Sequence, residues 1–176
     1  MPRALVIALV LGLLLPGMAW AQDGLGVTSA SIVDGKLVKP HACSRHGGRN
    51  VSPEISVTGL PDGTTHLAIV MDDPDAMAPA GKVWVHWNVV NIPASQTAFP
   101  AGQKPPGKEL HHSGGGTSYA GMCPPDGVHE YRIAVFALNG EIDAGGFFGP
   151  SELTIERFAD KYAGKILARG MVTGRF

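Results

Sequence analysis

The sequence predicts a mostly β domain with a minor helical part, in which two sheets pack against each other. Glycine and proline account for 24 and 14 of the 176 residues, and a chain interrupted this often forms short strands and loops rather than long helices. Several apolar segments have the length and composition of strands, and one late segment has helical periodicity. Many strands with one late helix favour a two-sheet architecture.

The expected strands are separated by turns that contain glycine, proline or aspartate. The sequence Asp72-Asp73-Pro74-Asp75 is expected to end one of them, since proline cannot donate a hydrogen bond to a neighbouring strand. The strand over 83–92 has large apolar side chains on both faces, so we expect it to be central and covered on both sides. Strands are expected at 25–38, with a turn at Asp34-Gly35, and at 55–57, 66–71, 83–92, 130–138 and 166–176.

Two further segments complete the expected fold. Residues 93–116 are rich in Pro, Gly and His and predict a long loop, which in a compact domain usually has a function or is mobile. A helix is expected to begin after a cap at Ser151 and to end near Gly164. Its buried side would be formed by Leu153, Ile155, Phe158, Ala159 and Tyr162.

Residues 1–21 have the pattern of a secretory signal peptide. A basic start is followed by an apolar run over 4–15, and Ala19 and Ala21 are the small residues that a signal peptidase reads. We expect cleavage before Gln22 and therefore a periplasmic or secreted protein. An uncleaved membrane anchor is the alternative, although the apolar run is shorter than the about 20 residues that span a bilayer.

The expected mature chain, residues 22–176, has the size of one domain. Arg3 is the only charged residue in the signal segment, so the mature chain carries one fewer than the 14 Lys and Arg of the whole, against 15 Asp and Glu. This slightly acidic balance argues against non-specific nucleic-acid binding, which requires a basic face. Since no second long apolar run follows, we expect no membrane span after cleavage.

The two cysteines, Cys43 and Cys123, would reach an oxidising compartment after export, where a pair usually forms a disulfide. Only one intramolecular pairing exists, and it would close a loop of about 80 residues. On the loop-entropy model such a bond contributes roughly 4 kcal/mol to stability. The alternative is two free thiols, one of them reactive.

Two segments combine carboxylates, imidazoles and aromatic rings. The carboxylates of the 72–75 turn could orient a histidine or bind a cation, or they could simply be solvated. In the 83–92 strand, Trp84, His86 and Asn88 are expected to point the same way. A carboxylate on one ring nitrogen of His86 and an anion on the other would keep this ring charged. The alternative is a core histidine with one backbone partner.

A third segment, 119–131, is rich in turns and leads into a strand. Its glycines and prolines fix a backbone that can approach a ligand closely. His129 and Tyr131 share a face of the strand and can present an imidazole and a phenol to the same space. Ordinary turn chemistry with one exposed histidine is the alternative.

Four motifs in order resemble the phosphatidylethanolamine-binding protein family, and most of all its bacterial Raf kinase inhibitor-like branch. They are Asn-Val-Ser-Pro-Glu at 50–54, Asp-Pro-Asp-Ala at 73–76, Val-His-Trp at 85–87 with Asn-Ile-Pro at 91–93, and 119–131 with its Cys-Pro-Pro and His-Glu-Tyr. The resemblance covers nearly all of 22–176 and implies one domain with a large antiparallel sheet on a smaller one. The positions of Cys43 and Cys123 are similar to those in exported members, which supports the disulfide.

The resemblance also implies a pocket that takes phosphate-like groups, including phospholipid headgroups, or acetate- and cacodylate-like anions. No cofactor and no metal are implied. Met77, Met122 and Val57 depart from the family pattern, and the first two are expected to alter the pocket rim. The implied pocket residues are Asp73, Asp75, Trp84, His86, Pro125, His129 and Tyr131.

Three functions are open to such a chain. The favoured one is binding of a small anionic ligand, such as a phosphate ester or headgroup. A hydrolase could use the same carboxylates and histidines, but the sequence has no Gly-x-Ser-x-Gly or His-Glu-x-x-His motif, and Ser113 and Ser118 are unsupported nucleophiles. A metal version would use His86, His129 and a carboxylate, with 111–112 nearby. An extracellular regulator that acts through an unknown protein partner is the third.

Overall fold

The computed structural model describes residues 24–145 and 152–176. The expected signal peptide and the expected cap at Ser151 lie outside these residues. Within them, two sheets pack face to face and a helix covers the outer face of the larger sheet, so the predicted mostly β fold is confirmed. No helix in the described part of the chain is long and apolar enough to cross a membrane.

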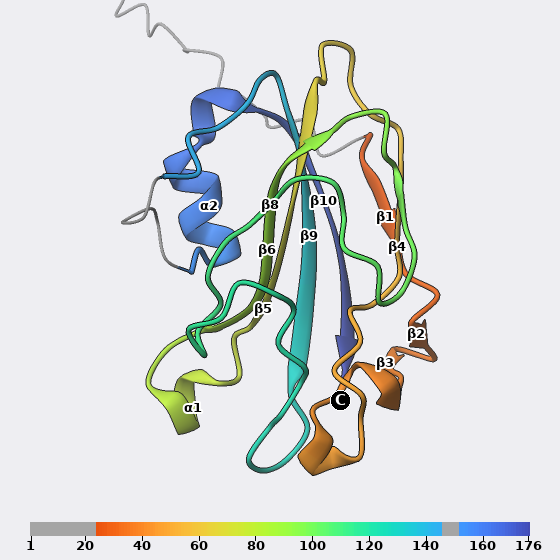
Figure 1. Cartoon of the computed structure of the whole chain (residues 1–176), viewed down its shortest axis with the longest axis vertical. Coiled ribbons are helices and arrows are strands. Elements are labelled where there is room, and N and C mark those ends of the chain that lie inside the picture. The colour runs from red at the N-terminus through yellow and green to blue at the C-terminus, as the bar shows by residue number, and fades with distance from the viewer. Residues whose placement is uncertain (1–23, 146–151) are drawn as a thin grey trace, which may run out of the picture.

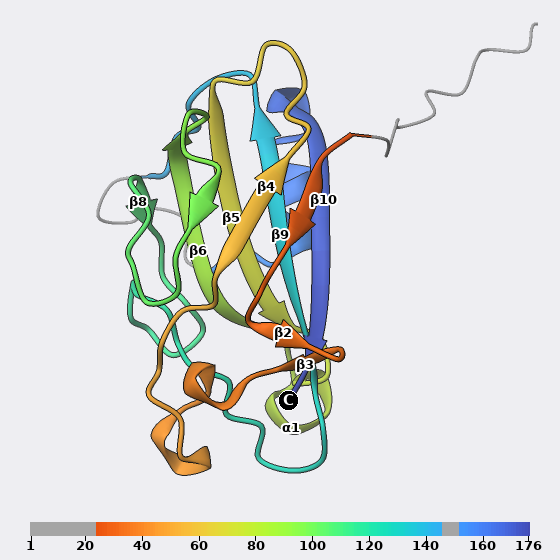
Figure 2. The same cartoon turned by 90° about the vertical axis from the view of Figure 1, so that its right-hand side faces the viewer.

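The smaller sheet has three antiparallel strands and the larger sheet has seven strands. Figures 1 and 2 show the two sheets from two directions. All strand pairs are antiparallel except one, the parallel contact between β10 and β3 at Arg175 and Lys36. The smaller sheet has the order β1 (Gly26–Thr28), β4 (Ile55–Thr58), β7 (Ala98–Phe99). The larger has the order β2 (Ile32–Val33), β3 (Lys36–Leu37), β10 (Ile166–Arg175), β9 (Glu130–Leu138), β5 (His66–Asp73), β6 (Trp84–Pro93), β8 (Lys108–Glu109).

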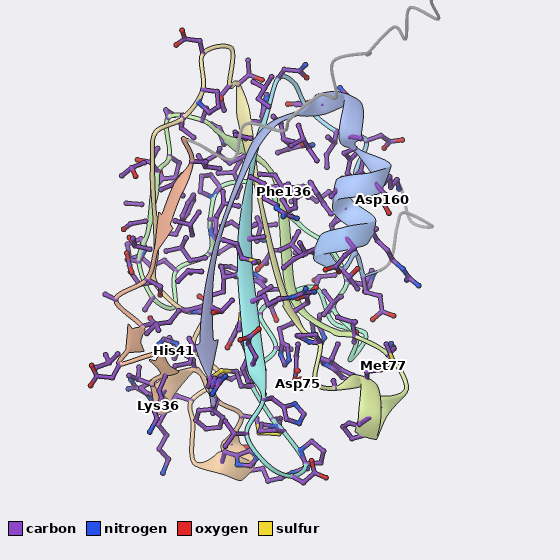
Figure 3. All side chains as sticks on the ribbon, turned by 180° about the vertical axis from the view of Figure 1, so that it is seen from behind. Lys36, His41, Asp75, Met77, Phe136 and Asp160 are labelled. Atoms are coloured by element: carbon purple, nitrogen blue, oxygen red, sulfur yellow. A yellow bond between two sulfur atoms is a disulfide. The ribbon has the colours of Figure 1, made fainter. Side chains whose placement is uncertain are left out.

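Two apolar clusters hold these layers together. One lies between the sheets and contains Ile55 from the small sheet and Trp87 from the large one. The other lies between the large sheet and α2 (Ile155–Lys161) and includes Phe136, which Figure 3 labels. The ring of Phe136 is 4.5 Å from that of Phe158. Burial on both faces explains why the long strands carry apolar residues at consecutive positions.

Several expected boundaries were wrong. Strand β5 does not end at Met71 but continues through Asp73, because both aspartates find partners inside the sheet and only Pro74 breaks the pairing. The expected loop 93–116 contains strands β7 and β8. Strand β6 is covered on both faces but is not central, since β8 pairs with only two of its residues and then ends the sheet. Backbone N–H groups of 110–120 donate to the rest of this edge.

A β-bulge interrupts β6 at the histidine. Met71 lies opposite Trp87 and Asp72 lies opposite Val85, so His86 is the extra residue. The bulge turns His86 to the side of Trp84, whereas Asn88 lies opposite Val70, which belongs to the cluster under α2. The expectation that Trp84, His86 and Asn88 point the same way was therefore wrong for Asn88.

The helical parts are shorter than expected. Thr154 caps α2, because its hydroxyl accepts a hydrogen bond from the Arg157 N–H at 3.2 Å. A four-residue helix that the sequence did not predict, α1 (Met77–Ala80), follows the acidic turn. The remaining helical turns are of the 3-10 type, at Lys39–His41, Ser44–His46 and Ala163–Lys165, and Gly164 lies in the last of them.

Candidate functional site

A cavity of about 320 Å³ lies at the end of the large sheet where α1, the loop after β8 and the loop before β9 meet. We call it the histidine pocket. Its walls come from segments far apart in sequence: the end of β5, α1, the start of β6, and the loops around 112–114 and 120–125. Its lining residues are Asp73, Ala76, Pro79, Ala80, Trp84, His86, His112, Gly114, Ala120, Gly121, Cys123, Pro124, Pro125 and His129.

Asp73 and His129 form a buried pair in the wall of the pocket. The Asp73 Oδ2 accepts a hydrogen bond from His129 Nδ1 at 2.8 Å, and its Oδ1 accepts one from the Ala76 N–H at 3.1 Å. The two residues are 3% and 5% exposed, so water competes little for these bonds. The carboxylate therefore fixes the orientation of the imidazole, and the expected orienting role of Asp73 is what the geometry allows.

His86 has a different environment from the one expected. Its Nδ1 lies 2.7 Å from the backbone oxygen of Ala120 and must donate, because a carbonyl oxygen only accepts. Burial lowers the pKa of His86 to about 4, against the smaller opposing effects of the Ala120 oxygen and the Asp73 charge. The ring is thus neutral near pH 7. No carboxylate contacts it, and its one backbone partner is what the alternative interpretation expected.

Tyr131 lies behind the pocket rather than in its lining. Its ring stacks with that of His129 at 6.5 Å and meets that of His86 edge-on at 5.3 Å. The hydroxyl is fully buried, and its pKa is raised first by burial and then by the nearby Asp73 carboxylate. It lies near that carboxylate without the geometry of a hydrogen bond. Tyr131 therefore supports both imidazoles from behind.

The acidic turn divides its carboxylates among three places. Asp75 is exposed, and its Oδ2 accepts the Glu130 N–H at 2.8 Å, so it ties the turn to β9 and is absent from the pocket lining among the described residues. Asp72 points to the opposite face of the sheet, where it binds Arg132. Only Asp73 faces the pocket, because neighbouring residues of a strand point to opposite sides.

The sequence did not single out His112 as a pocket residue. The loop that carries it runs along the edge of β6, where the Ser113 N–H donates to the Val85 oxygen at 2.9 Å. Burial and then the neighbouring His111 lower the pKa of His112. The unusual density of Pro, Gly and His in 93–116 was the only signal for it. The sheets alone could not have placed it, since it depends on loop conformation.

The candidate nucleophiles lie elsewhere. The Ser113 hydroxyl accepts the Val85 N–H at 2.9 Å, and Ser118 lines a separate cavity with Trp87 and Lys104. Neither is among the described residues that line the histidine pocket.

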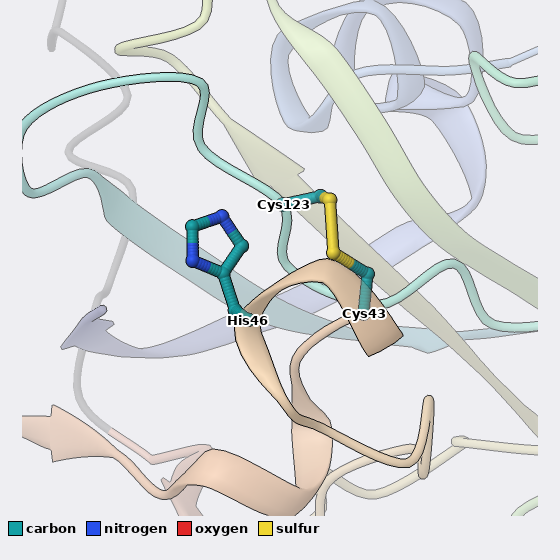
Figure 4. Close-up of side chains that lie close together, drawn as sticks. All are labelled: Cys43, His46 and Cys123. Carbon is teal, nitrogen blue, oxygen red and sulfur yellow. A yellow bond between two sulfur atoms is a disulfide. The ribbon is translucent and has the colours of Figure 1, made fainter.

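The Cys43–Cys123 disulfide ties the 39–50 loop to the pocket wall, with Cα atoms 5.5 Å apart, and the predicted pairing is confirmed. Figure 4 shows His46 beside it, and its Nε2 lies 2.9 Å from the Pro124 oxygen. In the described part of the chain, Cys43, His46 and Cys123 are the one group of three or more metal-ligating side chains whose ligand atoms lie within 4.8 Å of one another. Both sulfurs are used in the disulfide, and the metal version built on His86 and His129 receives no support from this geometry.

The two methionines that depart from the family pattern do not form the pocket rim. Met77 is 52% exposed on α1 and is absent from the lining among the described residues. Met122 is fully buried in the cluster between the sheets. The expectation that both reshape the rim was wrong, because the backbone turns the Met122 side chain inward while its neighbours Gly121 and Cys123 face the cavity.

Comparison with known proteins agrees with this geometry. YbcL of Escherichia coli is 40% identical over 128 residues, 65% of this chain and 69% of YbcL. A UPF0098 protein of Aquifex aeolicus is 36% identical over 159 residues, 85% of this chain and 86% of its own length. The YbcL crystal structure, described as a member of the mammalian PEBP family, superposes with a TM-score of 0.72 at 31% identity and covers 87% of this chain and 98% of that one.

CT736 of Chlamydia trachomatis superposes with a TM-score of 0.73 over 87% of this chain and 97% of its own, at 23% identity, and so shares the fold. The family model described as phosphatidylethanolamine-binding protein matches residues 28–176, which include the larger sheet, all of the smaller sheet except the first two residues of β1, and every residue that lines the histidine pocket. The chain belongs to the phosphatidylethanolamine-binding protein family.

Proposed function

We propose that the histidine pocket binds a small oxyanion group, such as a free phosphate, a phosphate ester or a phospholipid headgroup. The observation that carries the proposal is the convergence of Asp73, His86 and His129 on one cavity of about 320 Å³. A cavity of this size accepts a small headgroup, and a few placed polar groups among apolar walls are typical of ligand sites.

The donors for such a group come from the rings that line the cavity. His129 donates to Asp73 through Nδ1, and its Nε2 lies 3.9 Å from the exposed Asp126 carboxylate, too far for a hydrogen bond. This nitrogen can therefore meet a ligand, and it donates when the ring is protonated. The indole of Trp84 lies in the same wall and carries one N–H. Pro79, Pro124 and Pro125 supply apolar walls that exclude water, which strengthens each polar contact. Such bonds contribute roughly 1.5–3 kcal/mol each when charged.

Calorimetric titration of the purified protein with inorganic phosphate tests the proposal. We expect saturable binding, weakened about tenfold or more in His129→Ala, which removes one charge-assisted bond. His66→Ala is the matched control, since His66 lies at the opposite end of the strand that carries Asp73 and is absent from the lining among the described residues. Equal phosphate binding by the wild type and His129→Ala would overturn the pocket assignment.

We also propose that the protein is exported to the periplasm or beyond the cell. The signal-like start and the disulfide support this location. Mass spectrometry of the protein recovered from a Gram-negative host should find Gln22 as the first residue. Recovery of chains that still begin at Met1 would contradict cleavage.

A further inference from the structure

The polar lining of the histidine pocket contains more acceptors than an ordinary anion site. Among the described residues, the ionisable side chains of the lining are Asp73, His86, His112 and His129. Asp73 brings a negative charge into the wall, and a fully deprotonated dianion placed here would face it. A ligand that carries its own proton avoids part of this repulsion.

His86 adds a second acceptor whose identity follows from geometry. Because Nδ1 donates to the Ala120 oxygen at 2.7 Å, the lone pair of the neutral ring is on Nε2. His86 is 3% exposed and lines the pocket. The lowered pKa of His86 agrees with this neutral tautomer. Nε2 therefore accepts a hydrogen bond from a ligand and does not donate one.

The charged and titratable groups around His86 come from every neighbouring segment. Asp73 lies on β5, and His112 lies on the loop along β6. His129 directly precedes β9, and Tyr131 lies on that strand. Burial has the largest effect and lowers the pKa of His86, and His112 and His129 lower it further, while the Ala120 oxygen and the Asp73 charge act in the opposite direction. The neutral tautomer is thus a property of the whole site.

We propose that the histidine pocket selects oxyanions that still carry a proton, such as hydrogen phosphate or a phosphate monoester monoanion, through the His86 Nε2 acceptor. The inference rests on the proposed function. A ligand P–OH donates to Nε2, while its unprotonated oxygens accept from the Trp84 N–H and, when the His129 ring is protonated, from the His129 Nε2–H. An aprotic oxyanion of the same shape would set lone pair against lone pair at His86, and a buried mismatch of this kind is a strong source of specificity.

Phosphate and sulfate at pH 8 separate the proton from charge and shape. Both are then mainly tetrahedral dianions, but hydrogen phosphate has one O–H and sulfate has none. We expect calorimetry on the purified protein to give phosphate at least about tenfold tighter binding, the factor for one lost hydrogen bond. Equal affinities would overturn the inference and leave the proposed function standing. If neither phosphate nor sulfate binds, both the inference and the proposed function are overturned.

A matched pair of variants assigns the selectivity to His86. His41 is equally buried at 3% and also binds a backbone oxygen through Nδ1, that of Val51 at 2.8 Å, but it does not line the pocket among the described residues. We expect His86→Phe to bring the phosphate-to-sulfate ratio close to one and His41→Phe to keep it. An unchanged ratio in a folded His86→Phe protein would overturn the assignment.

Nitrogen NMR of the wild type gives a test that needs no variant. We expect the His86 ring to show a protonated Nδ1 and an unprotonated Nε2 from pH 6 to pH 8. A protonated Nε2 in this range would overturn the inference directly.

Discussion

Asp72 and Asp73 are neighbours on one strand, are both buried, and face opposite sides of the sheet. On the helix side, Asp72 accepts two hydrogen bonds from the Arg132 guanidinium at 2.8 and 2.9 Å and one from the Ile155 N–H at 3.0 Å. On the pocket side, Asp73 binds His129 and the Ala76 N–H, beside a cavity. The difference teaches that residue type does not decide the role of a buried carboxylate. The role depends on how many fixed hydrogen-bond partners the carboxylate has.

Protein groups occupy the hydrogen-bond positions of Asp72 on the helix side, whereas Asp73 on the pocket side lies beside a cavity that a ligand can enter. The Asp72 hydrogen bonds raise the pKa of Arg132, so the guanidinium stays charged, and the pair joins the first turn of α2 to the sheet. The Asp73 pair leaves His129 Nε2 without a hydrogen bond, 3.9 Å from the exposed Asp126 carboxylate, so it can meet a ligand. We therefore expect changes on the helix side to reduce stability and changes on the pocket side to alter binding.

The largest effect should come from the covalent tie beside the pocket. The double variant Cys43→Ser/Cys123→Ser lacks the bond that closes the loop between residues 80 positions apart. On the loop-entropy model this loss lowers the free energy of unfolding by about 4 kcal/mol. Urea denaturation followed by circular dichroism measures it. A loss below about 1 kcal/mol would mean that the 39–50 loop constrains the chain without the bond.

A change at Asp72, the aspartate on the helix side, should have the next largest effect on stability. Asp72→Asn removes the charge that faces Arg132 and leaves a buried network poorly matched, so we expect a loss of about 3 kcal/mol with little change in phosphate affinity. Glu156→Gln is the control, because Glu156 binds the same guanidinium but is 57% exposed, and it should cost less than about 0.5 kcal/mol. Similar losses in the two variants would erase the distinction between buried and exposed partners.

Acid should destabilise the pocket side through His86. Its pKa is about 4 when folded and 6.5 in the ordinary ring, so the unfolded chain binds more protons between these values. Stability therefore rises with pH across this window, and acidification from pH 6.5 to pH 4 should remove about 3 kcal/mol through this ring. We expect His86→Phe to show a correspondingly flatter profile in denaturation at each pH. Parallel profiles for the two proteins would contradict it.

The same contrast explains how far the sequence could lead. Strand β9 was predicted with its observed bounds, and Asp73, Trp84, His86, Pro125 and His129 do line one cavity. The alternation of side chains along the strands and the family motifs are sufficient to predict these features. Asp75 and Tyr131 were misplaced because a side chain one turn or one layer away from a cavity has the same sequence pattern as one that lines it.

Features that depend on tertiary contacts could not be predicted. The bulge at His86 follows from pairing with β5, and the placement of His112 follows from hydrogen bonds along the edge of β6. The neutral state of His86 follows from burial and from the Ala120 oxygen, which lies 34 residues away in sequence. Apart from the density of Pro, Gly and His around His112, none of these features has a local signal in the chain.

The smallest effect separates the two aspartates most sharply. Asp73→Asn keeps the shape of the side chain and an oxygen that can accept the His129 Nδ1–H, so we expect a stability loss of only about 1 kcal/mol. It removes the negative charge from the pocket wall, so sulfate should bind at least about threefold more tightly than in the wild type and the phosphate-to-sulfate ratio should fall. Calorimetry at pH 8 measures both affinities. If sulfate affinity falls instead, the carboxylate acts mainly by orienting the His129 ring, and the pocket repels dianions through His86 alone.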